Sequence, residues 1–150
     1  TNQNIRTMGI ALTPTILPQA GKPTFEIGND EMEIGMGIHG EPGIRRGKLK
    51  SADEITQELS DKILDDINLS SGDEVSVLIN SLGATPHEEL FITAKKFNNI
   101  LKEKGIINKK SYVGRYATSM EMAGMSITIL KLDSELEKLL LDQTNCPFWF

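Results

Sequence analysis

The residue with the clearest capacity for chemistry is His39, which stands in the run G-M-G-I-H-G-E-P-G at residues 35–43. A neutral imidazole can act as a nucleophile or take up a proton near neutral pH. Glycines on both sides would let a small substrate lie against the backbone. Taken alone, a single histidine in such a turn is more often structural. The run also matches G-x-G-x-x-G, but Pro42 and Gly43 break the helix that a dinucleotide site needs there.

Three other segments could bind a ligand or a partner, and each also has a simpler explanation. Residues 80–86, N-S-L-G-A-T-P, join an expected strand to a helix N-terminus. Free N–H groups there can hold an anion, although an ordinary connection is the preferred interpretation. The basic run at 44–50 could contact phosphate or an acidic partner, or be a solvated loop. The aromatic tail at 146–150 could dock on a partner or pack back on its own core.

Composition excludes several functional classes. The 150 residues include 16 Lys and Arg against 21 Asp and Glu, a net charge of −5, so we expect no direct nucleic-acid binding. Cys146 is the only cysteine, and His39 and His87 share no ligand spacing, so neither a disulfide framework nor a metal site is expected. No apolar run could span a membrane and no signal peptide is evident, which indicates a cytoplasmic protein.

The elements that must position His39 follow from the periodicity of apolar residues. Residues 25–39 predict a β-hairpin, with a short strand at 25–27, a turn at 28–30 and alternating apolar residues from Met32 to Ile38. Residues 1–24 predict an irregular lead-in from a preceding subdomain, with a strand near 7–12. The dense cations of 44–50 follow the histidine run as a loop.

Downstream, helices and strands alternate. Capping boxes predict helices that begin after Ser51 and at Thr85-Pro86. Strands are predicted at 74–79, 111–117 and 125–132, and Asp133 or Ser134 can cap a last short helix. We therefore predict an α+β fold, a two-layer sandwich of a mixed β-sheet with helices mainly on one face.

Taken whole, the run E-M-E-I-G-M-G-I-H-G-E-P-G-I at 31–44 resembles the signature of the dihydroxyacetone kinase family, in its substrate-binding subunit or domain. Residues 6–12, 80–86 and 118–128 resemble further stretches of that family, in the same order. The resemblance covers nearly the whole chain. It implies that residues 25–150 form the second, C-terminal subdomain of the dihydroxyacetone-binding subunit, and that residues 1–24 lead in from an α/β subdomain.

By resemblance, His39 is the catalytic and substrate-binding residue, because the histidine of the family's I-H-G-E-P-G motif bonds covalently to the substrate carbonyl as a hemiaminal. The family places nucleotide and magnesium on a partner subunit or domain, so this chain is expected to bind neither. The donor there is ATP, or a nucleotide rephosphorylated by a sugar phosphotransferase-system protein. The resemblance also implies a homodimer, and a chain that is inactive alone because the preceding subdomain supplies half of the pocket.

The same resemblance leaves a second function open. Some family members keep the binding histidine but lack the catalytic aspartate, and act as dihydroxyacetone-sensing transcriptional coactivators. Residues 141–146, L-D-Q-T-N-C, depart from the proline-containing pattern expected of the kinases. The residues that would separate kinase from sensor are expected upstream of Thr1.

Overall fold

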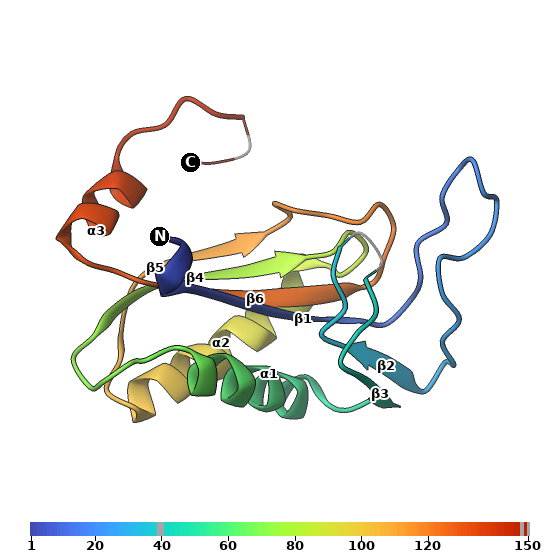
Figure 1. The fold of residues 1–150 in the computed structure, drawn as a ribbon, viewed down its shortest axis with the longest axis horizontal. Coiled ribbons are helices and arrows are strands. Elements are labelled where there is room, and N and C mark those ends of the chain that lie inside the picture. The colour runs from blue at the N-terminus through green and yellow to red at the C-terminus, as the bar shows by residue number, and fades with distance from the viewer. Residues whose placement is uncertain (39–40, 148, 150) are drawn as a thin grey trace.

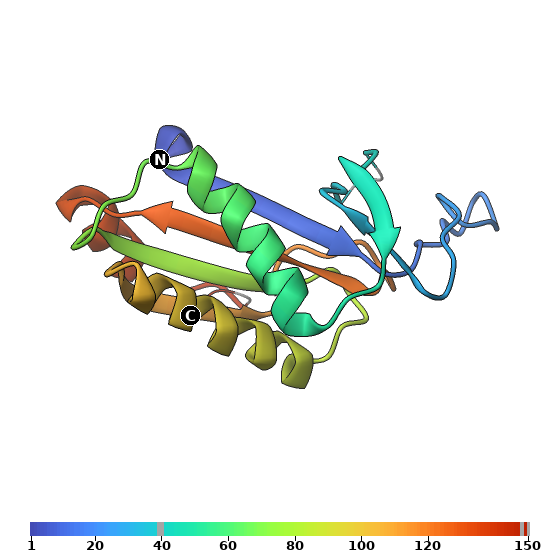
Figure 2. The ribbon, with the colours of Figure 1, turned by 90° about the horizontal axis from the view of Figure 1, so that it is seen from below.

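The computed structural model describes residues 1–38, 41–147 and 149, which form an open sheet with two long helices against one face (Figures 1 and 2). The strands lie in the order β3-β2-β1-β6-β4-β5, and β4 and β5 are the parallel pair. The predicted α+β sandwich, with helices mainly on one face of a mixed sheet, is confirmed. The elements are η1 (Asn2–Asn4), β1 (Ile5–Ala11), β2 (Glu31–Ile34), β3 (Arg45–Lys48), α1 (Ala52–Asp66), β4 (Glu74–Ser81), α2 (His87–Glu103), β5 (Ile107–Gly114), β6 (Gly124–Lys131) and α3 (Ser134–Leu141).

The main core lies between the sheet and the helices α1 and α2. Apolar residues recur along one side of each helix, while alternate residues of the inner strands point toward that side. Full burial of one such side chain contributes about 1.5–3 kcal/mol to folding. The fully buried members of this core include Leu59, Leu90, Phe97, Val77, Ile79, Ile127 and Ile129.

The predicted hairpin over residues 25–39 is wrong. Residues 25–27 lie outside any strand, and β2 instead pairs antiparallel with β1 and β3. The alternating pattern stops early because Gly35 takes a φ of 78°, a left-handed conformation that ends the strand. The basic run expected as a loop contains β3, whose Arg45 lies opposite Ile34.

The helix starts give one confirmation and one correction. Ser51 and Glu54 form the predicted capping box of α1. At α2 the predicted box is absent, and Pro86 is the N-cap without a side-chain hydrogen bond. The Thr85 hydroxyl is engaged elsewhere, since it donates to the Gly124 carbonyl at 2.8 Å and accepts from the Gly124 N–H at 2.9 Å. A tertiary contact has taken the place of the local cap.

Strand β1 is an inner strand of the sheet, paired with β6 along its whole length. The segment 12–30, between β1 and β2, extends away from the sheet (Figure 1). The division into a lead-in at 1–24 and a subdomain at 25–150 stays a prediction. Within the part of the chain that the structure describes, none of the helices combines the length and the apolar character that a membrane span requires.

Candidate functional site

The predicted site residue His39, with Gly40, lies outside the described residues, so the site is built from the segments on either side of it. β2 leads into the run 35–43 and β3 leads out of it. The Ile44 N–H donates to the Ile34 carbonyl at 2.7 Å, which closes the base of this run. We call residues 35–43 the glycine loop.

The base of the glycine loop leaves no room for side chains. The Gly35 N–H donates to the Gly9 carbonyl of β1 at 2.7 Å. A Cβ at Gly35 would lie 2.8 Å from the Ile44 side chain, and a Cβ at Gly43 would lie 2.5 Å from the Ile34 carbonyl oxygen. Both distances are shorter than carbon contacts allow, so these glycines permit the two ends of the loop to come together.

The residues that immediately precede His39 rest on a second apolar cluster. Met36, Ala11, Leu82 and Met122 are buried together, and Ile38 packs against them. These side chains come from the end of β1, the connection after β4 and the connection before β6. Three separate parts of the chain therefore support the incoming half of the glycine loop.

Two of the sequence motifs interlock beneath this cluster. The connection at 80–86 and the segment at 118–128 exchange backbone hydrogen bonds: Leu82 donates to Gly124, Ala84 to Met122, and Ser119 to Leu82, at 2.6–3.0 Å. Gly83 has a φ of 149°, and any side chain there would run into the Met120 carbonyl. Several backbone groups of 80–86 are thus bonded to the second segment, and the Gly83 N–H donates to Ser81 Oγ, which supports the ordinary-connection interpretation over an anion site.

Asn80 organises the neighbouring connection from the other face of the sheet. Its buried Oδ1 accepts the N–H groups of Tyr116 and Ala117, both at 2.9 Å, and its Nδ2 donates to the Ala117 carbonyl at 2.7 Å. Sequence analysis placed Asn80 in a connection and missed this role. The available signal was its strand position, which alternates with the apolar residues that face the helices.

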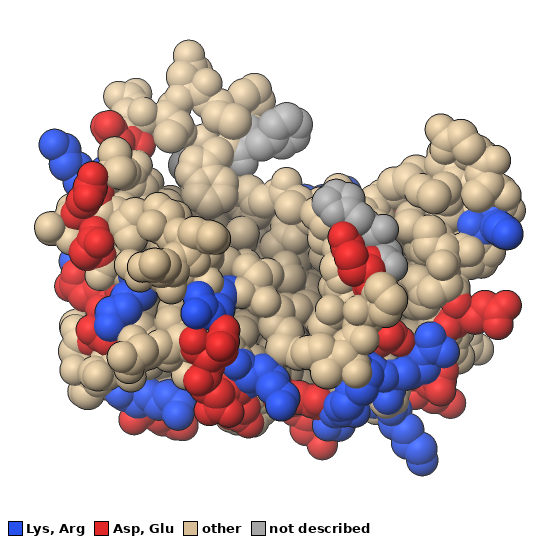
Figure 3. Space-filling model, viewed as in Figure 1, with Lys and Arg blue, Asp and Glu red and all other residues tan. Residues whose placement is uncertain are grey.

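A hollow of about 670 Å³ lies beside the glycine loop. It reaches from the sheet face that points away from the helices, around the edge of β1, to Lys62, Ile63 and Asp66 of α1. Part of its wall is polar, since the hydroxyls of Thr7 and Thr128 are hydrogen-bonded at 2.9 Å. In Figure 3 the upper surface is hollowed, and most charged side chains gather on the side of the helices. The residues that line the hollow include Gly35, Met36, Gly37, Ile38, Thr7, Gly9, Asn80, Ser126 and Thr128.

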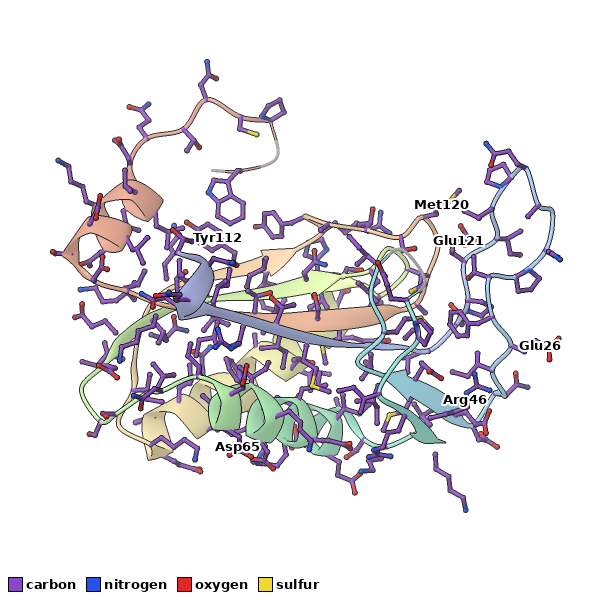
Figure 4. The ribbon with its side chains drawn as sticks, viewed as in Figure 1. Glu26, Arg46, Asp65, Tyr112, Met120 and Glu121 are labelled. Carbon is purple, nitrogen blue, oxygen red and sulfur yellow. The ribbon has the colours of Figure 1, made fainter. Side chains whose placement is uncertain are left out.

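Two carboxylates fasten the rim of this region. Glu33 accepts hydrogen bonds from the Gly43 N–H and from Arg46. Glu121 accepts the Ile16 N–H, which holds the pKa of the Glu121 carboxyl below its usual range and ties the segment 12–30 to the connection before β6. Figure 4 shows Met120 and Glu121 beside that segment. The sequence analysis assigned no role to either carboxylate.

The remaining predicted segments lie elsewhere. Arg45 and Lys50 of the basic run both pair with Glu58 of α1, so the two cations share one carboxylate within the chain. Trp149 of the aromatic tail stacks on Tyr112, with ring centroids 4.2 Å apart. Trp149 therefore packs on β5, Cys146 and Pro147 are exposed, and Phe148 and Phe150 lie outside the described residues. His87 is exposed at the start of α2.

Within residues 1–38, 41–147 and 149, no three His, Cys, Asp or Glu side chains come close enough together to hold a metal ion. The described groups can supply a closed loop base, an apolar support and a hydroxyl-lined wall. The hydroxyls of this wall can hydrogen-bond to a small hydroxylated ligand, while Arg6, Lys62 and Asp66 bring charges to the end of the hollow near α1.

Comparison with known proteins gives consistent matches. The family model for the Dak1 domain matches residues 1–148. The dihydroxyacetone-binding subunit DhaK of PTS-dependent dihydroxyacetone kinase 2 from Listeria innocua is 45% identical over 148 residues, which are 99% of this chain and 45% of that protein. The chain therefore spans less than half the length of this curated relative.

Two solved structures share the fold. The dihydroxyacetone kinase operon co-activator Dha-DhaQ superposes with a TM-score of 0.84 and 33% identity, covering 91% of this chain and 43% of that one. The dihydroxyacetone kinase of C. freundii superposes with a TM-score of 0.81 and 28% identity, covering 98% of this chain and 27% of that one.

Proposed function

The chain belongs to the Dak1 domain family, and from that premise we propose that it is the substrate-binding part of a dihydroxyacetone kinase, with His39 as catalytic and substrate-binding residue. One observation carries the proposal: the glycine loop that contains His39 is closed at its base directly beside the hydroxyl-lined hollow. A triose with two hydroxyl groups and one carbonyl could hydrogen-bond to the hydroxyls of such a wall and would occupy only part of the hollow.

The proposed chemistry is capture of the carbonyl. The lone pair of a ring nitrogen of His39 forms a C–N bond to the carbonyl carbon of dihydroxyacetone as the C=O π bond breaks. The carbonyl oxygen takes up a proton, and the imidazole releases the proton from its other nitrogen, which leaves a neutral hemiaminal. Glycerol has no carbonyl and cannot form this bond. One histidine would thus separate a short ketose from a polyol of nearly the same shape.

Phosphorylation to dihydroxyacetone phosphate needs more than this chain. We assign the nucleotide and magnesium to a partner subunit or domain, since phosphoryl transfer requires a metal-bound donor and a base near the accepting hydroxyl. A preceding α/β subdomain would complete the pocket, and the working protein would be a cytoplasmic homodimer. On this proposal the 150 residues alone are inactive.

The test uses the full natural protein that contains this sequence, mixed with a donor subunit, magnesium and either ATP or the phosphotransferase proteins. NMR follows carbon-13-labelled dihydroxyacetone in this mixture. A new sp³ carbon signal on the protein, lost in His39→Ala, is expected, together with dihydroxyacetone phosphate. The matched control is His87→Ala, which replaces the other histidine, exposed on α2. Adduct formation that survives His39→Ala would overturn the proposal.

A second function is favoured by one observation, the likeness to the co-activator structure at 33% identity. In this alternative the same capture signals the presence of dihydroxyacetone to a transcription factor instead of preparing it for phosphorylation. The NMR experiment separates the two. Adduct without phosphorylated product under either donor, with a partner protein that binds more tightly when dihydroxyacetone is added, would establish the sensor.

A further inference from the structure

A buried carboxylate lies at the base of the glycine loop, and the proposed function gives it no role. Glu33 of β2 is 9% exposed. Its Oε1 accepts the Gly43 N–H at 3.2 Å, and its Oε2 accepts the Nε–H of Arg46 in β3 at 3.0 Å. A glutamate is rarely buried without a partner, and these two hydrogen bonds supply the partners of Glu33.

The two contacts differ in what they join. Glu33 and Arg46 face each other in the β2–β3 register, so their ion pair lies within the sheet. Gly43 belongs to the outgoing end of the glycine loop. Its backbone is pressed against the glutamate, since a Cβ at Gly43 would lie 2.9 Å from Glu33 Cγ. The carboxylate therefore connects the rigid strand pair to the loop.

Stability alone is a weak reason for a charge at this position. The Arg46 side chain is 43% exposed, so its ion pair with Glu33 is partly screened by solvent and contributes little to stability. An apolar side chain on β2 could fill the space but could not accept the Gly43 N–H. The Glu33 carboxylate, held in place by Arg46, offers that acceptor in a fixed position, and its 3.2 Å distance to the Gly43 nitrogen is at the long end of the range for N–H···O bonds.

We propose that Glu33 is a positioning residue, whose carboxylate, oriented by Arg46, fixes Gly43 and with it the outgoing end of the loop that carries His39. This inference rests on the proposed function. Met36 and Ile38 anchor the incoming half of the loop by apolar contact, and Glu33 anchors the outgoing half by a charged hydrogen bond. Carbonyl capture requires the reacting atoms to be aligned, so a loop anchored at one end only would form the adduct poorly.

The experiment compares three variants in the longest natural protein that carries this sequence. Glu33→Met keeps the volume and removes the acceptor, and Glu33→Gln keeps one acceptor oxygen. The matched control is Glu58→Met. Glu58, like Glu33, accepts two hydrogen bonds, but its donors are Arg45 and Lys50, which lie outside the glycine loop. Binding of carbon-13-labelled dihydroxyacetone is titrated by NMR, and urea unfolding of each variant is measured in parallel.

Glu33→Met is expected to weaken dihydroxyacetone binding by about ten- to a hundredfold. Glu33→Gln should recover part of this loss, while Glu58→Met should bind as the unsubstituted protein does. A role in stability alone would move unfolding and leave binding unchanged. If Glu33→Met binds dihydroxyacetone as tightly as Glu58→Met, the inference is wrong.

A further variant keeps the test decisive if Glu33→Met does not fold. Arg46 has a side chain 43% exposed, so Arg46→Ala is tolerated, and loss of the orienting cation should weaken binding by about two- to fivefold. Unchanged binding in Arg46→Ala would also overturn the inference. Failure of the proposed function looks different, because the unsubstituted protein would then form no adduct at all.

Discussion

The two faces of the sheet are built by the same strands and have opposite chemistry. Toward α1 and α2, β4 and β6 present valine, isoleucine and methionine side chains that are at most 5% exposed. On the opposite face the same strands present Asn80, Ser126 and Thr128, which border the hollow. The first face provides the stability of the domain. The second holds polar groups and connections in position beside the glycine loop. Asn80 can be buried there because it is hydrogen-bonded, while Ser126 and Thr128 are half-buried.

The largest effect is expected from a cavity in the helix-covered face. Phe97→Ala removes a fully buried ring from α2 and should lower the free energy of unfolding by about 3–5 kcal/mol, measured by urea denaturation. The control is Phe91→Ala on the same helix, where the ring is 57% exposed and the cost should stay under about 0.5 kcal/mol. If both substitutions lowered the free energy of unfolding equally, burial of Phe97 under the helix-covered face would not be what stabilises the domain.

A smaller effect is expected on the opposite face from Asn80→Ala. This change leaves the N–H groups of Tyr116 and Ala117 and the Ala117 carbonyl without their partner, and should cost about 1–3 kcal/mol in urea unfolding. Asn80→Asp keeps an acceptor for the two N–H groups, but it buries a charge and sets a carboxylate oxygen against the Ala117 carbonyl, so near pH 7 its cost should be at least as large as that of Asn80→Ala. No loss in Asn80→Ala would mean that the polar face contributes nothing to stability.

The smallest effect concerns the ion pairs of Glu58 on α1 and depends on pH. The ammonium of Lys50 and, less strongly, the guanidinium of Arg45 lower the pKa of Glu58 from its usual value of 4.5. A carboxyl whose pKa is lowered by folding stabilises the protein above its unfolded pKa and loses that contribution as the pH falls through the folded pKa.

Glu58→Gln should therefore be less stable than the unsubstituted protein near pH 7, by up to about 1 kcal/mol. The difference should disappear on acidification below the lowered pKa of Glu58. Thermal unfolding at a series of pH values measures it. A difference that grows at low pH would contradict the assigned direction of the shift.

Much of the fold follows from local sequence. The capping box at Ser51 and the cap at Asp133 predict the starts of α1 and α3, because a side chain satisfies free N–H groups within the same turn. Alternating apolar residues predict β4 and β6 within two residues of their observed ends. The overall sandwich could be predicted because each of these signals lies within a few neighbouring residues.

The errors come from contacts between distant parts of the chain. The alternation from Met32 to Ile38 suggested one long strand, but Gly35 turns the backbone toward β1 and the glycine loop begins there. Thr85 has the residue type of a helix cap, yet its hydroxyl binds Gly124, 39 residues away. No local pattern contains the partner in either case.

The sequence by itself determined the sandwich and the family resemblance, and through that resemblance it predicts His39 as the substrate-binding residue, which stays a prediction. Only the tertiary structure decided what surrounds that loop: the apolar support under Ile38, the interlocked connections and the Glu33 contact to Gly43. The physical reason is that a motif encodes residue types along one segment. The supports of the glycine loop come from β1, β2 and β3 and from the connections after β4 and before β6. Their approach is fixed by sheet order and by glycines that allow backbones to touch.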